Sequence, residues 1–278
     1  MRAEAFAPAK INLTLHVTGQ RADGYHLLDS LVGFADIGDR VTAEKGKGLS
    51  LTVSGPMADG VPTDGTNLIL KAARLMAPDG DAALSLEKHL PATSGIGGGS
   101  SDAAAALTAL SRLWDTPLPP LEKIASLGAD VPVCLSHVPQ RLRGIGEDLT
   151  PLPPLPPCEI LLVNPGIAVA TPPVFAALST KTNPPMPDTL PKWGDARALA
   201  TWLHMMRNDL HKPAATLVPE IDAVLDALEE TNCLIARMSG SGATCFALYE
   251  PGRGNAQRAA NTLTQVHPNW WVAAGKLL

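Results

Sequence analysis

The strongest constraint on the fold of this chain lies in residues 91–105, with the sequence PATSGIGGGSSDAAA. Four glycines, Gly95, Gly97, Gly98 and Gly99, precede an alanine-rich segment of high helix propensity. Glycine adopts backbone conformations that other residues avoid and allows a ligand to approach the backbone closely. A helix N-terminus adds unpaired N–H groups and a partial positive charge. The segment therefore predicts a phosphate-binding loop that leads into a helix.

Two common phosphate loops do not match this segment. The P-loop pattern needs a lysine before its hydroxyl residue, but here Ser100 follows Gly99 directly. The dinucleotide pattern G-x-G-x-x-G can be placed on part of the run. It also needs an acidic residue at the end of a following strand, and here Asp115 ends the predicted helix instead. This argues against a dinucleotide-dependent oxidoreductase, and a glycine turn without a ligand is the remaining structural alternative.

Composition indicates a globular protein with a sizeable core, since 45% of the 278 residues are hydrophobic and 18% are charged. The length favours about two domains, and we place their boundary at the proline-rich segment 151–157, which gives lobes 1–150 and 151–278. A net charge of -5 without any Lys/Arg run argues against a nucleic-acid partner.

Hydropathy and the first residues of the sequence bear on location. No segment approaches the roughly 20 apolar residues that span a bilayer. The first residues lack the pattern of a secretory signal. We therefore expect a cytoplasmic protein without a membrane partner, as a monomer or weak homodimer.

Cysteine and histidine positions predict no structural metal. The four cysteines form no C-x-x-C pair and lie among apolar residues, which favours buried thiols over a disulfide framework. They are Cys134, Cys158, Cys233 and Cys245. The histidines are scattered, without H-E-x-x-H spacing.

Hydrophobic periodicity predicts strands and helices that do not alternate strictly, which favours an α+β fold in two lobes over a doubly wound sheet. The predicted strands cover residues 5–18, 31–43, 49–54, 83–88, 159–163, 234–238, 243–249 and 269–274. The predicted helices cover residues 66–77, 100–115, 196–206, 214–230 and 255–264. Thr66 is the expected N-cap of the first helix, and the serines before Asp102 are the expected caps of the second. A second proline-rich segment, 183–191, is predicted to be an exposed loop.

Three motifs resemble the signature segments of the GHMP small-molecule kinases. They are Pro8–Leu13 (PAKINL), Pro91–Ser101 and Ser239–Gly242 (SGSG). The resemblance implies a two-lobed fold with mixed and antiparallel sheets and packed helices. It also implies an ATP-dependent kinase that phosphorylates a hydroxyl group of a small metabolite.

Further segments resemble one branch of this family, in which a cytidine diphosphate-linked alcohol is phosphorylated during non-mevalonate isoprenoid precursor biosynthesis. The most specific are residues 19–26 (GQRADGYH) and 128–132 (GADVP). The segments 116–127 and 135–143 depart from the family pattern. A homoserine or sugar kinase is the alternative within the family, and a nucleotide-binding protein without catalysis is the alternative outside enzymes.

The resemblance assigns catalysis to two residues. Asp130 matches the family's catalytic base, which accepts a proton from the attacking hydroxyl. Lys10 matches the cation beside it. Because Lys10 lies in an apolar, strand-like stretch, its burial without a charged partner would be costly. The structural alternatives are a carboxylate that caps a turn and a strand-edge lysine that faces water.

The resemblance also implies the ligand-binding residues. Asn67 is expected near the adenine of ATP, with helix capping as its alternative, and Mg²⁺ is expected with the ATP phosphates. The residues expected to bind the phosphates are Pro91, Ala92, Thr93, Ser94, Gly95, Ile96, Gly97, Gly98, Gly99, Ser100 and Ser101. Thr93 and Ser94 stand where the family often has glycine.

The expected substrate site contains Asn12, Tyr25, His26, Thr171, Phe175, Gly240 and Ser241. In this reading Tyr25 and His26 recognise the cytosine of the cytidine diphosphate substrate. Phe175 is the second aromatic residue, so that the base stacks between two rings. Ordinary core packing is the alternative for Phe175.

Overall fold

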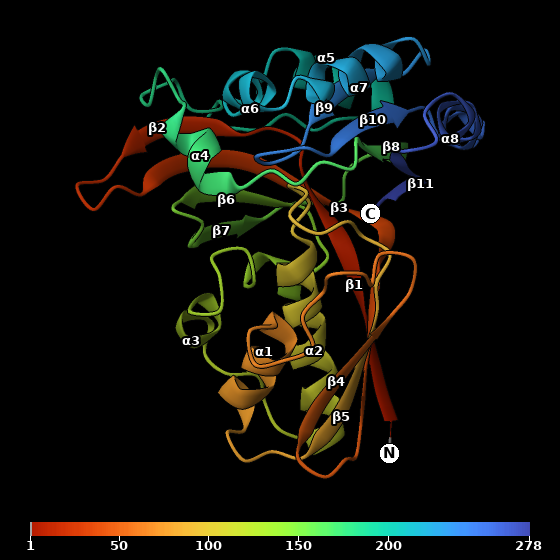
Figure 1. The fold of residues 1–278 in the computed structure, drawn as a ribbon. Helices are drawn as coiled ribbons and strands as arrows, with labels where there is room; N and C mark the ends of the chain where they lie inside the picture. Colours follow the sequence, from red (N-terminus) through yellow and green to blue (C-terminus); the bar gives the residue numbers. More distant parts are fainter. Residues whose placement is uncertain (1) are drawn as a thin grey trace. The chain divides into compact units, whose positions relative to one another are not determined.

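The computed structural model describes residues 2–278 and divides into two compact units (Figure 1). Unit 1 contains the chain up to Lys10 together with Gly38–Ala92 and Gly97–His137. Unit 2 contains Ile11–Ile37, Thr93–Ile96 and Val138–Leu278. The units differ from the predicted division at residue 150, because strands β1 (Arg2–Asn12) and β3 (His26–Glu44) are long and contribute residues to both.

Unit 1 combines strands with two packed helices. Strands β4 (Leu49–Ser54) and β5 (Ala82–Glu87) pair in parallel, and β5 pairs antiparallel with the last residues of β3. Buried and exposed residues alternate along β5, as expected for a strand with one face on the core. Helices α1 (Leu68–Met76) and α2 (Gly98–Trp114) lie side by side (Figure 1). The short helices α3 (Leu121–Ala125) and η1 (Val133–Leu135) complete the unit.

Unit 2 is built on antiparallel strands. Its strands, besides the first part of β3, are β2 (His16–Gln20), β6 (Gln140–Gly144), β7 (Asp148–Pro151), β8 (Cys158–Asn164), β9 (Ile235–Met238), β10 (Cys245–Tyr249) and β11 (Trp271–Leu277). Their order is β3-β11-β8-β10-β9, while β2 and β6 pair with β3 and β7 pairs with β6. Strand β8 is buried along nearly its whole length, as its continuous aliphatic run predicts.

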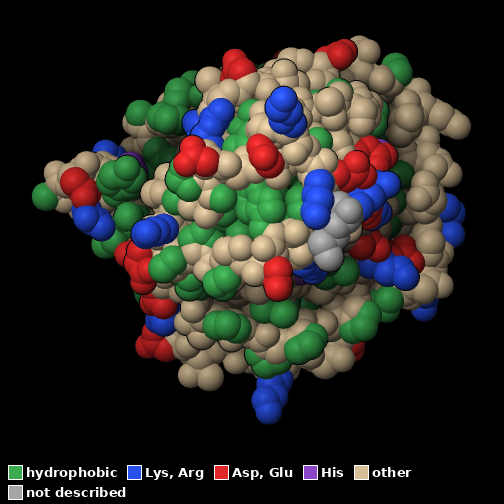
Figure 2. Space-filling model, turned by 90° about the horizontal axis from the view of Figure 1, so that it is seen from below, with side chains coloured by type: hydrophobic (Ala, Val, Ile, Leu, Met, Phe, Trp, Pro, Cys, Tyr) green, Lys and Arg blue, Asp and Glu red, His purple; other side chains and the backbone are tan. Residues whose placement is uncertain are grey.

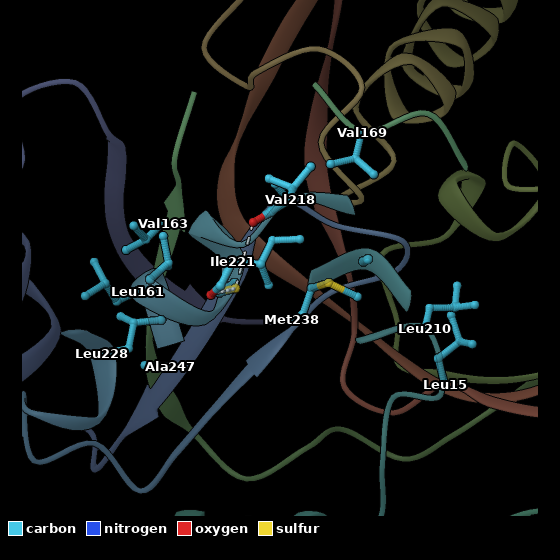
Figure 3. Packing of buried hydrophobic residues seen from close by; sticks show 14 of the residues in the cluster. Leu15, Leu161, Val163, Val169, Leu210, Val218, Ile221, Leu228, Met238 and Ala247 are labelled. Carbon is cyan, nitrogen blue, oxygen red and sulfur yellow. Dashed lines mark hydrogen bonds between the residues drawn. The ribbon is translucent and has the colours of Figure 1, made fainter. Parts of the chain in front are cut away.

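Five helices belong to unit 2. They are α4 (Thr171–Ala176), α5 (Ala196–His204), α6 (His211–Leu217), α7 (Glu220–Glu229) and α8 (Asn255–Val266). Helices α5 and α7 both pack against β9 and β10 (Figure 1). Figure 3 shows Leu161 and Val163 of β8 near Ile221 and Leu228 of α7. Each such aliphatic side chain stabilises the fold by about 1.5–3 kcal/mol when fully buried.

Most predicted elements are confirmed, and four details were wrong. The predicted strand 5–18 is two strands, since β1 ends at Asn12 and β2 begins at His16. The predicted helix 214–230 is two helices, because the backbone leaves the helical path at Val218, and Pro219 is the N-cap of the next helix, which begins at Glu220. The N-cap of α1 is Asn67 rather than Thr66. No serine caps α2, whose N-cap is Gly97.

The proline-rich segment 183–191 is only partly the exposed loop that was predicted. Met186 within it is buried. The backbone around it is held by Asp29 and Arg141, since the Met186 N–H donates to Asp29 Oδ2 and Arg141 donates to the carbonyl oxygens of Pro187 and Asp188. The segment is therefore anchored by buried charges.

The surface seen in Figure 2 carries acidic and basic side chains interspersed with apolar ones. Among the side chains described on that face, the basic ones form no continuous stripe. Across residues 2–278, no helix combines the length and the apolar character needed to span a bilayer.

Candidate active site

The first element of the candidate site is an ion pair in unit 1. The Lys10 Nζ atom lies 2.7 Å from Asp130 Oδ1. The lysine side chain is 5% exposed and the aspartate side chain 42% exposed. Lys10 therefore has the charged partner that its burial requires, and the alternative of a water-facing lysine does not hold. Asp130 presents a carboxylate that a substrate hydroxyl can reach.

The second half of the glycine-rich loop lies beside this ion pair, also in unit 1. Gly97 has φ 65, and a Cβ atom there would lie 3.1 Å from Lys10 Cβ. The Ser101 hydroxyl donates to the Pro8 carbonyl oxygen at 2.6 Å, which ties the first turn of α2 to β1. The first N–H groups of a helix have no acceptor within it. This end of α2 can therefore bind an anion close to Lys10.

The first half of the loop, Thr93–Ile96, belongs to unit 2 and contacts the SGSG loop. The Ser239 hydroxyl donates to the Gly95 carbonyl oxygen and accepts from the Asn12 N–H, both at 3.0 Å. A Cβ atom on Gly95 would lie 2.5 Å from the Ser239 carbonyl oxygen, and one on Gly240 would lie 2.7 Å from that of Gly95. Only glycine fits such a close approach of two backbones. Thr93 has φ 46, a conformation that glycine adopts more readily.

The predicted aromatic residues do not form an open sandwich. The His26 ring stacks on Phe175, with centroids 4.8 Å apart and an interplanar angle of 28°. A base between two rings would separate them by about 7–8 Å, given carbon contacts of about 3.5–4.0 Å on each side. Tyr25 is 62% exposed in the loop between β2 and β3. Phe175 is partly buried against the core of unit 2, so the core-packing alternative is correct in part.

The imidazole of His26 has an unused hydrogen-bonding atom. Its Nε2 is buried and has no hydrogen-bond partner. Burial, and secondarily the positive charge of Lys181, lowers the pKa of His26. The ring is therefore neutral at pH 7, with one nitrogen that donates and one that accepts. Such a ring can pair with the edge of a base.

The other predicted substrate residues also lie in unit 2. The Thr171 and Ser241 hydroxyls share a hydrogen bond of 2.9 Å. The Asn12 Nδ2 donates to the Ser30 hydroxyl at 2.8 Å. The Gly240 carbonyl oxygen accepts from Asn208, which also donates to Met238. Sequence reasoning did not assign Asn208 a role.

Asn67 caps helix α1. Its Oδ1 accepts from the Ile69 N–H at 2.8 Å, and its Nδ2 donates to the Pro62 carbonyl oxygen at 2.7 Å. The capping alternative is thus correct. A role near adenine stays a prediction.

One buried cluster in unit 1 was not predicted. Lys88, directly after β5, contacts carboxylates of Asp39 and Asp102. Two features of the sequence could have indicated this cluster. Lys88 stands at the end of a predicted strand, and Asp102 lies in an alanine-rich helix. Neither residue type is usual in a core without a partner.

Comparison with known proteins places these observations in a family. The family model described as GHMP kinases N terminal domain matches residues 67–138, and that of GHMP kinases C terminal matches residues 189–269. The chain is 57% identical over 276 residues to a 4-diphosphocytidyl-2-C-methyl-D-erythritol kinase of Cereibacter sphaeroides, covering 99% of both chains. It is 54% identical over 279 residues to the kinase of that name from Ruegeria pomeroyi, covering 100% of both.

Solved structures agree with this grouping. A crystal structure of 4-(cytidine 5'-diphospho)-2C-methyl-D-erythritol kinase matches with 34% identity and a TM-score of 0.78, covering 99% of this chain and 98% of that one. A homoserine kinase from Cytophaga hutchinsonii matches with 18% identity and a TM-score of 0.67, covering 100% and 94%, which shows a shared fold. This chain therefore belongs to the GHMP kinase family and, within it, to the 4-diphosphocytidyl-2-C-methyl-D-erythritol kinases.

Proposed function

We propose that this ATP-dependent kinase phosphorylates the 2-hydroxyl of 4-diphosphocytidyl-2-C-methyl-D-erythritol in non-mevalonate isoprenoid precursor biosynthesis. The hydroxyl oxygen forms a bond to the γ-phosphorus of ATP, the bond from that phosphorus to the β–γ bridging oxygen breaks, and ADP leaves. The observation that carries the proposal is the contact of 2.7 Å between Lys10 and Asp130. It supplies a carboxylate and a cation in the family's catalytic positions.

Asp130 and Lys10 have complementary roles in this reaction. Asp130 accepts the proton that the hydroxyl loses as it attacks. Lys10 balances the charge of this carboxylate and the charge that develops on the transferring group. Because Lys10 is buried and held in place, little reorganisation is needed during the reaction.

The triphosphate is assigned to the glycine-rich loop. The N–H groups at the start of α2 face the phosphates, and Gly97 keeps the backbone close to Lys10. Mg²⁺ neutralises triphosphate charge when bound, and in such sites phosphate oxygens and water supply most of its ligands. The proposal assigns it no side chain of this protein.

The cytosine is assigned to unit 2. The unpaired nitrogen of the neutral His26 ring can form a hydrogen bond with either the amino group or the ring nitrogen on the edge of cytosine, which present a donor and an acceptor. For the base to stack between Tyr25 and Phe175, the imidazole must leave the face of Phe175. The expected binding is thus accompanied by a rearrangement of His26.

A homoserine or sugar kinase is the alternative function. Such substrates carry no base, so they leave the unpaired His26 nitrogen without a role. Turnover of ATP is to be measured with the cytidine diphosphate substrate, homoserine and mevalonate. Turnover with homoserine and none with the cytidine compound would overturn the substrate assignment.

The base assignment is tested with Asp130→Asn, which keeps the shape and removes the charge. We expect kcat to fall about 10²- to 10⁴-fold, the usual contribution of a general base. Asp59→Asn, a matched change at an exposed position of unit 1, should retain wild-type kcat. Full activity of Asp130→Asn would show that another group accepts the proton.

A further inference from the structure

A buried triad of charges lies in unit 1, outside the residues assigned so far. The side chains of Asp39, Lys88 and Asp102 are 0%, 4% and 6% exposed. They come from β3, from the end of β5 and from α2. The Lys88 Nζ atom contacts Asp39 Oδ2 and lies 2.7 Å from Asp102 Oδ2.

The two carboxylates are not equivalent. Asp39 Oδ1 accepts from the N–H groups of His89 and Leu90, so both of its oxygens have partners. Asp102 Oδ1 is buried and has no hydrogen-bond partner. With both carboxylates ionised, the triad carries a net charge of about -1, which is costly away from water. Of the two carboxylates, Asp102 is therefore the one whose protonation most favourably removes this negative charge.

The environment of Asp102 agrees with this assignment. Burial, and more weakly the charge of Asp39, raises the pKa of Asp102 to about 7 against the opposing effect of Lys88. Helix η1 packs against α2 and contains Cys134. Burial raises the pKa of the Cys134 thiol to about 12, so this thiol stays neutral. Strand β1 brings Lys10, which already pairs with Asp130.

Helix α1, which also packs on α2, faces it with apolar side chains. Its buried residues are Ile69, Leu70, Ala72 and Ala73. Lys71 and Arg74 of α1 are exposed. Among the described residues, the unneutralised charges next to Asp102 are thus those of the other two triad members, Asp39 and Lys88.

The triad touches the phosphate loop. A Cβ atom on Gly98, the first residue of α2, would lie 3.3 Å from Lys88 Nζ. Asp102 itself belongs to the next turn of the same helix. A negative charge on the triad therefore opposes the binding of another anion at this helix end, because buried charges are weakly screened.

We propose that Asp102 takes up a proton when ATP binds, so that the triad becomes neutral next to the triphosphate and holds the first turn of α2 in position. Asp102 is thus a positioning residue that acts through Lys88. This inference rests on the proposed function, which assigns the triphosphate to the loop that includes Gly98.

The proposal predicts how ATP affinity depends on pH. Above pH 7, free Asp102 is ionised, and binding must recruit a proton. Affinity in the wild type therefore falls as pH rises through this range, by up to about tenfold per pH unit. Asp102→Asn has no charge to neutralise, so its affinity should stay level and should exceed that of the wild type near pH 8.5. A merely structural role would instead weaken binding equally at every pH.

The experiment is titration calorimetry with Mg²⁺ and a non-hydrolysable β,γ-imido analogue of ATP. Measurements in two buffers of different ionisation enthalpy, between pH 6.5 and 9, give the number of protons taken up. Subtracting the value for Asp102→Asn cancels protons exchanged by the nucleotide. We expect up to one additional proton per nucleotide in the wild type near pH 8. Asp115→Asn, an exposed change at the other end of α2, should behave as the wild type.

Equal proton uptake by the wild type and Asp102→Asn would overturn the inference. If Asp102→Asn does not fold, carboxyl carbon NMR of the wild-type complex decides, and an ionised Asp102 in the complex at pH 7 would overturn it. Gly97→Ala tests the loop separately, since a Cβ there is strained and approaches Lys10. Unchanged ATP affinity in Gly97→Ala would refute the assignment of the triphosphate to this loop. Weakened affinity in Gly97→Ala without proton uptake in the wild type would refute only the role of Asp102.

Discussion

Replacing Arg141 by methionine should lower the free energy of unfolding by about 3–5 kcal/mol, the usual cost of breaking a buried ion pair. Arg141 lies on β6 in the segment that departs from the family pattern, and its side chain is buried. Its Nε and Nη2 donate to the two Asp29 oxygens at 2.8 and 2.7 Å. Its Nη1 donates to the carbonyl oxygens of Pro187 and Asp188 at 2.9 and 3.0 Å.

The magnitude follows from what remains after the substitution. Asp29 would keep the N–H of Met186, at 2.9 Å, but lose its charged partner while staying buried. Methionine fills much of the volume of the arginine stem, so the cavity contribution is small. Since a domain is stable by about 5–15 kcal/mol in total, the loss is a large fraction of it.

Urea denaturation followed by circular dichroism measures this loss. Arg253→Met is the matched control, because Arg253 is exposed and contacts Glu250 at 3.5 Å, and it should change stability by less than about 1 kcal/mol. The double variant Asp29→Asn/Arg141→Met should be more stable than the sum of the two single losses predicts. A loss below about 1 kcal/mol for Arg141→Met, or strict additivity in the double variant, would refute the reasoning.

Two further predictions concern recognition of the base. Phe175→Leu should raise KM for the cytidine substrate about 5- to 150-fold, equivalent to about 1–3 kcal/mol of stacking, with little change in KM for ATP. His267→Ala, in the separate stack on Trp270, should leave both KM values unchanged, and an equal effect of the two variants would contradict the assignment. Because the neutral form of His26 is assigned to cytosine and its pKa is lowered, KM for the cytidine substrate should stay constant above pH 6.5 and rise as pH falls through that lowered pKa. Steady-state kinetics of the wild type and His26→Asn check this, and a rise of equal size in the variant would assign it to another group.

Features that depend on neighbouring residues were predictable from the sequence. The glycine run before an alanine-rich segment predicted a loop and helix, and the structure places them at 93–114. The burial of Lys10 in an apolar strand correctly predicted a charged partner. The resemblance supplied the identity of that partner, because 120 positions separate Lys10 from Asp130 and no local pattern joins them.

Features that depend on distant contacts were not predictable. The partners of Lys88 lie 49 and 14 positions away, and those of Arg141 include Asp29 at a separation of 112. Thr66 and Asn67 are both good capping residues, so their local chemistry could not decide between them. The stacking of His26 on Phe175 requires α4 to meet the start of β3, which only the tertiary fold specifies.

The position of β11 has a consequence for biosynthesis. This strand pairs with β8 from Trp271 to Leu277 and reaches β3 at the pair Leu277↔Ala35. On the ribosome, β3 and β8 therefore emerge long before the strand that belongs between them. Until residues 271–277 leave the exit tunnel, β8 exposes an unpaired edge that neighbouring nascent chains can join. Cells making this kinase should depend on chaperones in that interval, and most strongly when translation slows after α8.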